Sequence, residues 1–191
     1  MGKSVGIVES KIFHCKDELA LVCGKKLSEF DLIYETYGKL NNNKTNAIFI
    51  PHALSGNHHI AGKYHKNDKY SGWWDNMVGP AKPIDTNKYF VIGINNLGGN
   101  DGSTSAKSIN PKTKKVWGSS FPILTVKDWV ASQKKLINSL GIEKLYAIVG
   151  GSLGGMQAMQ WSIDFPDAVE KILCIAAAPS LTAQNIAFNE V

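Results

Sequence analysis

Four continuous apolar runs divide the chain, and each is short enough to form a single strand. They cover residues 46–53, 89–96, 144–151 and 171–179. Runs of this kind lack the alternation of a strand with one solvated face, so each is predicted to be buried on both faces. Strands with two buried faces are typical of parallel sheets that helices cover.

The N-terminal region has a different pattern. Residues 31–38 alternate apolar and polar side chains and end at a glycine, while 5–15 and 19–23 are predicted to be short strands. Alternation is typical of an antiparallel strand with one face in water. The chain is therefore expected to enter its sheet through antiparallel strands.

Three helices are predicted after the strands. Residues 125–141 place most apolar side chains at i, i+3 and i+4, with Thr125 as N-cap and Gly141 as C-cap. Residues 152–165 and 180–191 are also predicted to be helical. The order strand, helix, strand, helix, strand predicts an α/β fold with a parallel sheet.

Two long segments are predicted outside these elements. Residues 52–72 are polar and glycine-bearing, and residues 97–122 show no periodicity. Loops of this length inside a compact domain are usually functional or disordered. Glycines also cluster in 93–102 and 150–155, which indicates tight turns or close approach of the backbone to a ligand.

The clearest chemistry lies where the third buried strand meets the next helix. Gly150, Ser152 and Gly154 form the pattern G-x-S-x-G, directly after the strand and directly before the helix. This context predicts the nucleophile elbow of an α/β-hydrolase fold, in which the serine lies on a strained turn. Ser152 is the predicted nucleophile, and Gly150 and Gly154 let the strand and the helix pass closely.

Two backbone amides are predicted to stabilise a tetrahedral oxyanion beside Ser152. One is the N–H of Leu153, at the start of the helix, where free N–H groups favour negative charge. The second donor of this fold comes from the loop after an earlier strand, and Leu54 is the candidate there, with Gly56 letting the loop approach.

A phosphate-binding turn is the main alternative for this glycine-rich segment. A dinucleotide-binding loop needs G-x-G-x-x-G, and Ser152 occupies one of the glycine positions. A P-loop needs a lysine after the glycines, and none follows. The nucleophile elbow is therefore favoured.

A serine nucleophile needs a base, and this fold supplies its triad in the order Ser, Asp or Glu, His. All five histidines precede Ser152. Asp164 and Asp167 follow it, but at the far end of the helix, where surface or capping roles are expected. We therefore expect a fragment, a truncated gene product or one part of a split enzyme.

Three histidines on the oxyanion-side loop leave two alternatives open. One alternative is that His52, His58 or His59 replaces the missing base, since their loop is expected near the serine, and the other is that the three bind zinc. Against zinc, their spacing lacks a helical i, i+4 pair and no carboxylate partner is evident; a missing second half is the simpler inference.

Composition and charge exclude several other classes of function. The net charge is +5, but every basic residue is a scattered lysine, which argues against nucleic-acid binding. Three cysteines without a C-x-x-C pair argue against a disulfide framework and a cysteine zinc site. Neither a metal nor a cofactor is expected. No apolar signal core and no membrane-length apolar run occur, so the expected location is the cytoplasm.

The chain resembles the homoserine O-acyltransferase family of methionine biosynthesis, whose members transfer acetyl or succinyl groups. The resemblance covers nearly all of the chain from residue 30. It rests on the segments LIYETYGKLN (32–41), HALSGNHHIAG (52–62), GWWDNMVGPAKPIDTNKYFVIGINNLGG (72–99), GSTS with SINP (102–111), FPILTVKDWV (121–130), GGSLGGMQAMQW (150–161) and AAAPSLTAQNIAFNEV (176–191).

The resemblance implies a ping-pong reaction. Ser152 would take the acyl group of acetyl-CoA or succinyl-CoA, and the hydroxyl of L-homoserine would then accept it. Leu54 and Leu153 match the family's oxyanion donors. The segment 52–62 resembles the succinyl-CoA subgroup, whereas Pro51 and Asn100 stand where cysteine is common in the family.

The resemblance also implies what residues 1–191 lack. Full-length members are about twice as long, and the triad Asp and His, an arginine for homoserine, a helical lid and the C-terminal strands lie in the second half. The chain is thus expected to be the N-terminal part of a single catalytic domain. A homodimer of the full-length enzyme is a further implication.

Two competing functions remain. An esterase of the same fold would use water instead of homoserine as the acceptor. A non-catalytic fragment would have an uncovered apolar sheet edge, prone to association.

Overall fold

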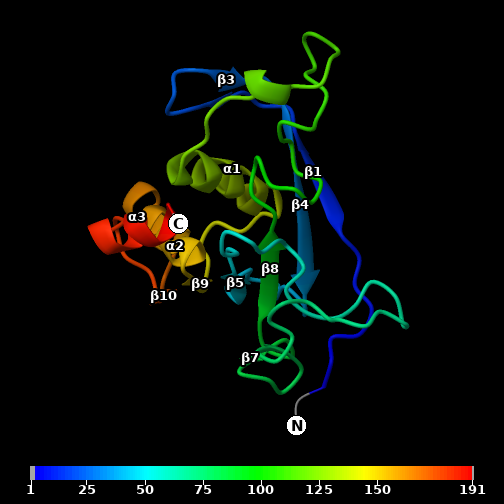
Figure 1. Ribbon diagram of the computed structural model, residues 1–191. Helices are drawn as coiled ribbons and strands as arrows, with labels where there is room; N and C mark the ends of the chain where they lie inside the picture. The colour runs from blue at the N-terminus through cyan, green and yellow to red at the C-terminus, as the bar shows by residue number, and fades with distance from the viewer. Residues whose placement is uncertain (1–2, 191) are drawn as a thin grey trace.

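A six-stranded sheet forms the centre of the computed structural model, which describes residues 3–190 (Figure 1). The strands follow in the spatial order β1 (Lys11–Cys15), β4 (Phe30–Tyr37), β8 (Phe90–Ile94), β5 (Ala47–Phe49), β9 (Ala147–Gly151) and β10 (Ile172–Ile175). The four apolar runs of the sequence are the strands β5, β8, β9 and β10, as predicted.

The sheet combines two kinds of pairing. β5, β8, β9 and β10 run parallel to one another, whereas β4 pairs antiparallel with both β1 and β8. This arrangement confirms the prediction of a mostly parallel α/β sheet that the chain enters through antiparallel strands.

Two helices cover one face of the sheet (Figure 1). These are α1 (Val126–Ser139) and α2 (Leu153–Asp164). Trp161 of α2 is fully buried and packs against Phe49 of β5, with ring centroids 6.1 Å apart. Burial of apolar surface between these helices and the strands supplies most of the force that holds the layer in place.

Loops rather than helices cover the opposite face. Ile48 and Val91 point to this side, where Ile60, Val78 and Ile84 pack against them. The short parallel pair β6 (Val78–Gly79) and β7 (Ile84–Asp85) belongs to this layer and was not predicted. Two residues per strand give too little periodicity to be recognised from sequence.

Several N-terminal elements differ from the prediction. The strand expected over 5–15 is regular only over β1, and the strand expected over 19–23 is regular only over β2 (Leu19–Ala20), which pairs with β3 (Lys26–Leu27) outside the main sheet.

The predicted helix over 125–141 is confirmed as α1. Short 3₁₀ turns at Gly118–Ser120 and Pro166–Ala168 complete the described elements, apart from α3.

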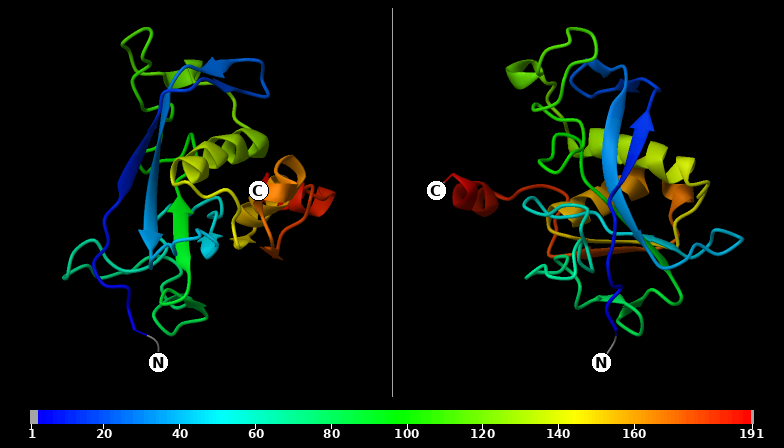
Figure 2. Two further views of the ribbon diagram at one scale, coloured as in Figure 1. Left: turned by 180° about the vertical axis from the view of Figure 1, so that it is seen from behind. Right: turned by 90° about the vertical axis from the view of Figure 1, so that its right-hand side faces the viewer.

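One prediction about burial is wrong. The run at 171–179 was expected to be buried on both faces, but every residue of β10 is at least partly exposed, with Leu173 49% and Ile175 47% accessible. β10 lies at the edge of the sheet, and no described element covers its outer side. The helix α3 (Ala183–Asn189) stands away from the body of the molecule (Figure 2).

Candidate active site

The predicted elbow is present between β9 and α2. Ser152 has φ 52° and ψ −123°, a left-handed conformation that side chains other than glycine rarely adopt. Its N–H donates to the carbonyl of Ile175 at 2.9 Å, and its own carbonyl accepts from Met156 at 3.1 Å. The residue itself is exposed. The strained turn therefore presents Ser152 to solvent at the carboxyl end of β9.

Two glycines of the motif are required by close backbone contacts. A Cβ on Gly150 would lie 2.2 Å from the carbonyl oxygen of Gly154, and a Cβ on Gly154 would lie 2.2 Å from that of Pro51. Both distances are far shorter than any real contact of a Cβ atom. The first contact lets strand and helix cross, and the second brings the elbow against the chain that leaves β5.

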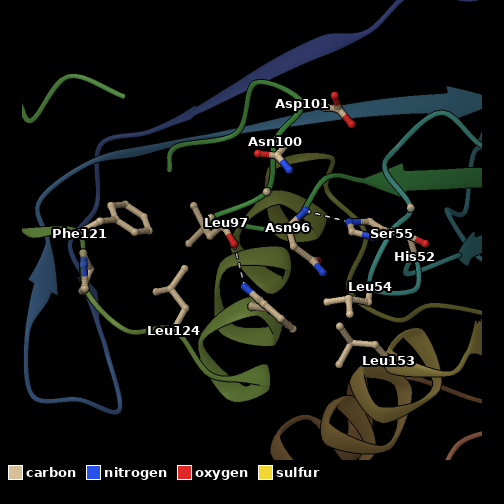
Figure 3. Close-up of a pocket in the computed structure, with 15 residues that line it drawn as sticks. His52, Leu54, Ser55, Asn96, Leu97, Asn100, Asp101, Phe121, Leu124 and Leu153 are labelled. Carbon is tan, nitrogen blue, oxygen red and sulfur yellow. Dashed lines mark hydrogen bonds between the residues drawn. The ribbon is translucent and has the colours of Figure 1, made fainter. Parts of the chain in front are cut away.

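The two predicted oxyanion donors lie on the wall of one pocket. Leu54 and Leu153 both line it, and Figure 3 shows their side chains next to each other, one from the loop after β5 and one from α2. Within residues 3–190, no hydrogen bond engages the backbone N–H of Leu54 or of Leu153. Both amides are thus available to a ligand.

The pocket has a volume of about 440 Å³. Residues 97–101 and Phe121, Pro122 and Leu124 form much of its wall, so the first and last parts of the long loop at 97–122 do line a cavity, as its length indicated. Trp129 donates from Nε1 to the carbonyl of Leu97 at 2.8 Å and fixes this wall to α1. Asn100, which stands where cysteine is common in the family it resembles, is among the lining residues.

His52 lines the same pocket, but both of its ring nitrogens are engaged. The N–H of Asn96 donates to Nε2 at 3.2 Å (Figure 3). Nδ1 therefore carries the proton and donates to the carbonyl of Ala53 at 2.7 Å. Burial lowers the pKa of His52 below its ordinary value. A neutral ring held at both nitrogens is a structural element of the loop, not a base for Ser152.

A buried amide network supports this region and was not found from the sequence. Gln133 of α1 donates to the side chains of Asn96 at 2.9 Å and Gln157 at 2.6 Å, and Gln157 donates to the carbonyl of His52 at 3.2 Å. Gln133 and Gln157 are fully buried. The only sequence signal was a glutamine on the otherwise apolar face of the helix at 125–141.

His58 and His59 face a different neighbourhood. Nε2 of His58 lies 2.8 Å from Oγ of Ser10, and Nδ1 of His59 donates to Glu35 at 3.1 Å. Burial lowers the pKa of His58. Among the described residues, no group of three or more His, Cys, Asp or Glu side chains is placed to hold a metal ion. These contacts therefore support neither the role of a base for Ser152 nor zinc binding by these histidines.

The acidic residues after Ser152 lie where the sequence indicated. Asp164 is at the last position of α2 and pairs with Lys127 at 3.7 Å, and Asp167 is exposed in the following 3₁₀ turn. Neither has a histidine partner among the residues that the structure describes. The predicted nucleophile and the two predicted oxyanion donors lie among residues 3–190, and all five histidines of the sequence precede Ser152.

No helix in the described part of the chain combines the length and the apolar character that crossing a membrane requires.

Comparison with known proteins agrees with the architecture. Residues 46–190 match the family model of the alpha/beta hydrolase fold. This match covers more than half of the chain and includes the elbow and the loop of Leu54. The chain therefore belongs to the α/β-hydrolase fold family, and the predicted fold class is confirmed.

A narrower likeness confirms the resemblance seen in the motifs. The chain is 60% identical over 188 residues to a homoserine O-succinyltransferase from Neisseria gonorrhoeae, a match that spans 98% of this chain and 50% of the relative. The chain thus spans about half the length of the curated relatives it matches.

Solved structures give the same picture. A homoserine O-acetyltransferase from Bacillus anthracis superimposes with a TM-score of 0.87 at 40% identity, over 93% of this chain and 48% of that one. Esterase E22 superimposes with a TM-score of 0.89 at 38% identity, over 96% and 51%. Both a transferase and an esterase are therefore built on this half-fold.

Proposed function

We propose that the chain supplies the nucleophile and the oxyanion site of a homoserine O-acyltransferase. Ser152 accepts an acyl group from acyl-CoA and passes it to the hydroxyl of L-homoserine. One observation carries the proposal: Ser152 is exposed on a strained turn, and the residue after it, Leu153, lines a pocket of about 440 Å³ together with Leu54, each with an unpaired backbone N–H.

The first step forms the acyl-enzyme. Oγ of Ser152 attacks the thioester carbon while its proton passes to a base, and the carbonyl oxygen becomes an oxyanion between the amides of Leu54 and Leu153. The carbon–sulfur bond then breaks, and the CoA thiolate leaves with the proton. Donors fixed in advance need no reorganisation as the charge develops, so they lower the barrier.

The second step repeats the displacement with a new nucleophile. The homoserine hydroxyl loses its proton to the base and attacks the acyl carbon, and the same two amides hold the oxyanion. The bond to Oγ breaks, and Ser152 regains a proton. The base for both steps lies outside residues 1–191, because every histidine of the chain precedes Ser152.

Succinyl-CoA is the favoured donor. The support is the name of the relative at 60% identity, a homoserine O-succinyltransferase, against 40% identity to the homoserine O-acetyltransferase. Donor choice depends on a few pocket contacts, so competition between the two donors in one assay decides it.

Ester hydrolysis is the second candidate, and the superposition on esterase E22 favours it. The two functions differ only in what attacks the acyl-serine. CoA release that continues at the same rate without homoserine indicates hydrolysis, whereas release that needs homoserine indicates transfer.

The decisive experiment completes the fold with a second half. Residues 1–191 are fused to the part of the Neisseria gonorrhoeae relative that lies beyond the matched region, and circular dichroism verifies that the fusion folds. We expect homoserine-dependent CoA release that Ser152→Ala lowers by about 10³-fold or more. A folded fusion without release, or release that survives the substitution, overturns the proposal.

Two further proposals follow from the same function. The cytoplasm is the proposed location, and a homodimer is the proposed state of the complete enzyme. Cell fractionation tests the first, and light scattering of the fusion tests the second.

A further inference from the structure

A carboxylate is buried on β4, the second strand of the sheet. Glu35 of β4 is fully inaccessible to solvent. It accepts hydrogen bonds from the hydroxyl of Tyr37 at 2.5 Å and from Ser10 at 3.1 Å, and from Nδ1 of His59 at 3.1 Å. Burial opposes its ionisation, but the hydrogen bonds from His59, Tyr37 and Tyr64 hold the pKa of Glu35 below its ordinary value.

The partners of Glu35 hold one end of the oxyanion-side loop, residues 52–62. His59 lies on this loop and binds Glu35 directly. The hydroxyl of Tyr37, oriented by its bond to Glu35, accepts from the N–H groups of Ile60 at 2.8 Å and Ala61 at 3.2 Å. Three consecutive residues of the loop are therefore tied to one carboxylate.

The other end of the loop is held independently. His52 is fixed by Asn96, and the carbonyl of Pro51 lies against Gly154 of the elbow. Between the two ends, Ala53 to Gly56 form a turn closed by the N–H of Gly56 on the carbonyl of Ala53 at 3.0 Å. Leu54 lies inside this turn, so the direction of its amide depends on both ends.

Burying an ionised carboxylate in a protein core costs desolvation free energy. Apolar residues of similar volume usually stabilise a fold as well or better, so a buried charge is weak evidence for a stabilising role. A fixed charge does hold several donors in one arrangement, as a carboxylate offers two oxygens with several acceptor positions. Two of the hydrogen-bond partners of Glu35, His59 and Tyr37, hold the loop of the proposed oxyanion donor.

We propose that Glu35 is a positioning residue that fixes the loop of residues 52–62 and thereby aims the amide of Leu54 at the acyl oxygen on Ser152. This inference rests on the proposed function. Its structural half, the fixing of the loop, holds or fails independently of any enzymatic activity.

The test compares two buried carboxylates in the full chain. Glu35→Gln replaces one acceptor oxygen with a donor and leaves the shape of the side chain. Asp128→Asn is the matched control, because Asp128 is 2% exposed and accepts from Val22 and Thr125 at the start of α1, away from the loop. Urea unfolding reports global stability, and hydrogen exchange with mass spectrometry reports the loop.

We expect the Glu35→Gln chain to exchange the amides of residues 53–61 about tenfold faster than the unchanged chain, beyond any global effect that unfolding reveals. Asp128→Asn is expected to leave exchange in these residues unchanged even if it lowers global stability more. Equal exchange in both variants after correction for global stability overturns the proposal.

A second variant keeps the test decisive if Glu35→Gln does not fold. Tyr37→Phe keeps the ring and removes the hydroxyl that joins Glu35 to Ile60 and Ala61. Faster exchange confined to 58–61 and the adjoining turn supports the proposal, and unchanged exchange there overturns it.

The effect of Glu35 on catalysis is measured in the fusion of residues 1–191 with the C-terminal part of the relative. Glu35→Gln is expected to lower kcat by about 10²-fold with KM for acyl-CoA within about twofold, as when an oxyanion donor is misplaced. A rise of KM with unchanged kcat overturns the positioning role. If the unsubstituted fusion is inactive, the proposed function fails, and the exchange data alone still decide whether Glu35 fixes the loop.

Discussion

Ser152 and Gly154 show how much of the site depends on single residues. Ser152 adopts a left-handed backbone that is unfavourable for its type, and the tight contact at Gly154 is part of what holds it there. The contact with Pro51 also couples the turn of Ser152 to the chain that carries Leu54. A side chain at position 154 would separate the segments of the two proposed oxyanion donors.

Gly154→Ala is predicted to lower the free energy of unfolding by about 1–3 kcal/mol or more, because the added methyl group collides with the carbonyl of Pro51. Urea denaturation of the chain measures the loss. Gly118→Ala is an informative comparison, since a Cβ there meets no atom within 4 Å and its cost comes from the positive φ alone. A smaller loss at Gly154 than at Gly118 would contradict the steric argument.

Two buried histidines predict how stability changes with pH. Burial lowers the pKa of His52 and of His58 below 6.5 in the folded chain. The unfolded chain therefore takes up protons first as pH falls through about 6.5, and folding loses stability from there towards the folded pKa values. Glu35 acts only at lower pH, since its ordinary value is 4.5 and folding lowers it.

Unfolding free energy is accordingly expected to change little just above pH 7 and to fall as the pH drops below about 6.5. Urea titrations at several pH values measure this, and His58→Gln should flatten the profile. Stability that rises on acidification in this window would show that these histidines are protonated more readily in the folded chain.

Residue roles were predictable only where neighbours in sequence define them. Gly150, Ser152 and Gly154 form one local turn, so their spacing was sufficient to locate it. Glu35 and Gln133 act through partners tens of residues away, such as His59 and Asn96, and no local pattern identifies such pairs. The sequence contains Glu35, but it does not reveal which residues its side chain contacts.

Elements were predicted best where periodicity and caps agree. α1 was expected over 125–141 and occupies Val126–Ser139. A capping box starts the helix: the side chain of Thr125 accepts from the N–H of Asp128, and the carboxylate of Asp128 accepts from the N–H of Thr125. The short strands β6 and β7 escaped prediction because they depend on the loop layer around them. The burial of β10 was overestimated because an apolar run does not tell a central strand from an edge strand.

Thr125→Ala is predicted to lower the free energy of unfolding by about 1 kcal/mol, since it removes the capping box of a helix packed in the core. Thr182→Ala is the matched control, because Thr182 caps α3 in the same way but that helix is exposed. The control should change global stability by less than about 0.5 kcal/mol. Equal losses in urea denaturation would show that α3 contributes to the cooperative core.

The whole molecule has an open apolar edge. Ile172, Leu173 and Ile175 of β10 are 37–49% exposed, and α3 adds Ile186 at 49% and Phe188 at 75%. Parallel strands are normally covered on both faces, and an unpaired edge offers hydrogen-bonding groups to another chain. This surface is therefore predicted to determine how the 191-residue chain behaves in isolation.

Self-association of this chain at micromolar concentration is the expected result, measured by sedimentation velocity over a dilution series. Leu173→Lys should weaken the association, because a charge at the edge opposes pairing. Ile123→Lys is a suitable control, since Ile123 is 77% exposed but lies far from β10 in sequence and outside the sheet. A chain that stays monomeric at all concentrations would contradict the prediction.

The most direct measurement is the mass of the peptide that contains Ser152 after the fusion has reacted with succinyl-CoA in the absence of homoserine. The account predicts one succinyl group on Ser152, which disappears when homoserine is added and never forms with Ser152→Ala. A succinyl group on another residue, or homoserine acylated without any intermediate on Ser152, would contradict it.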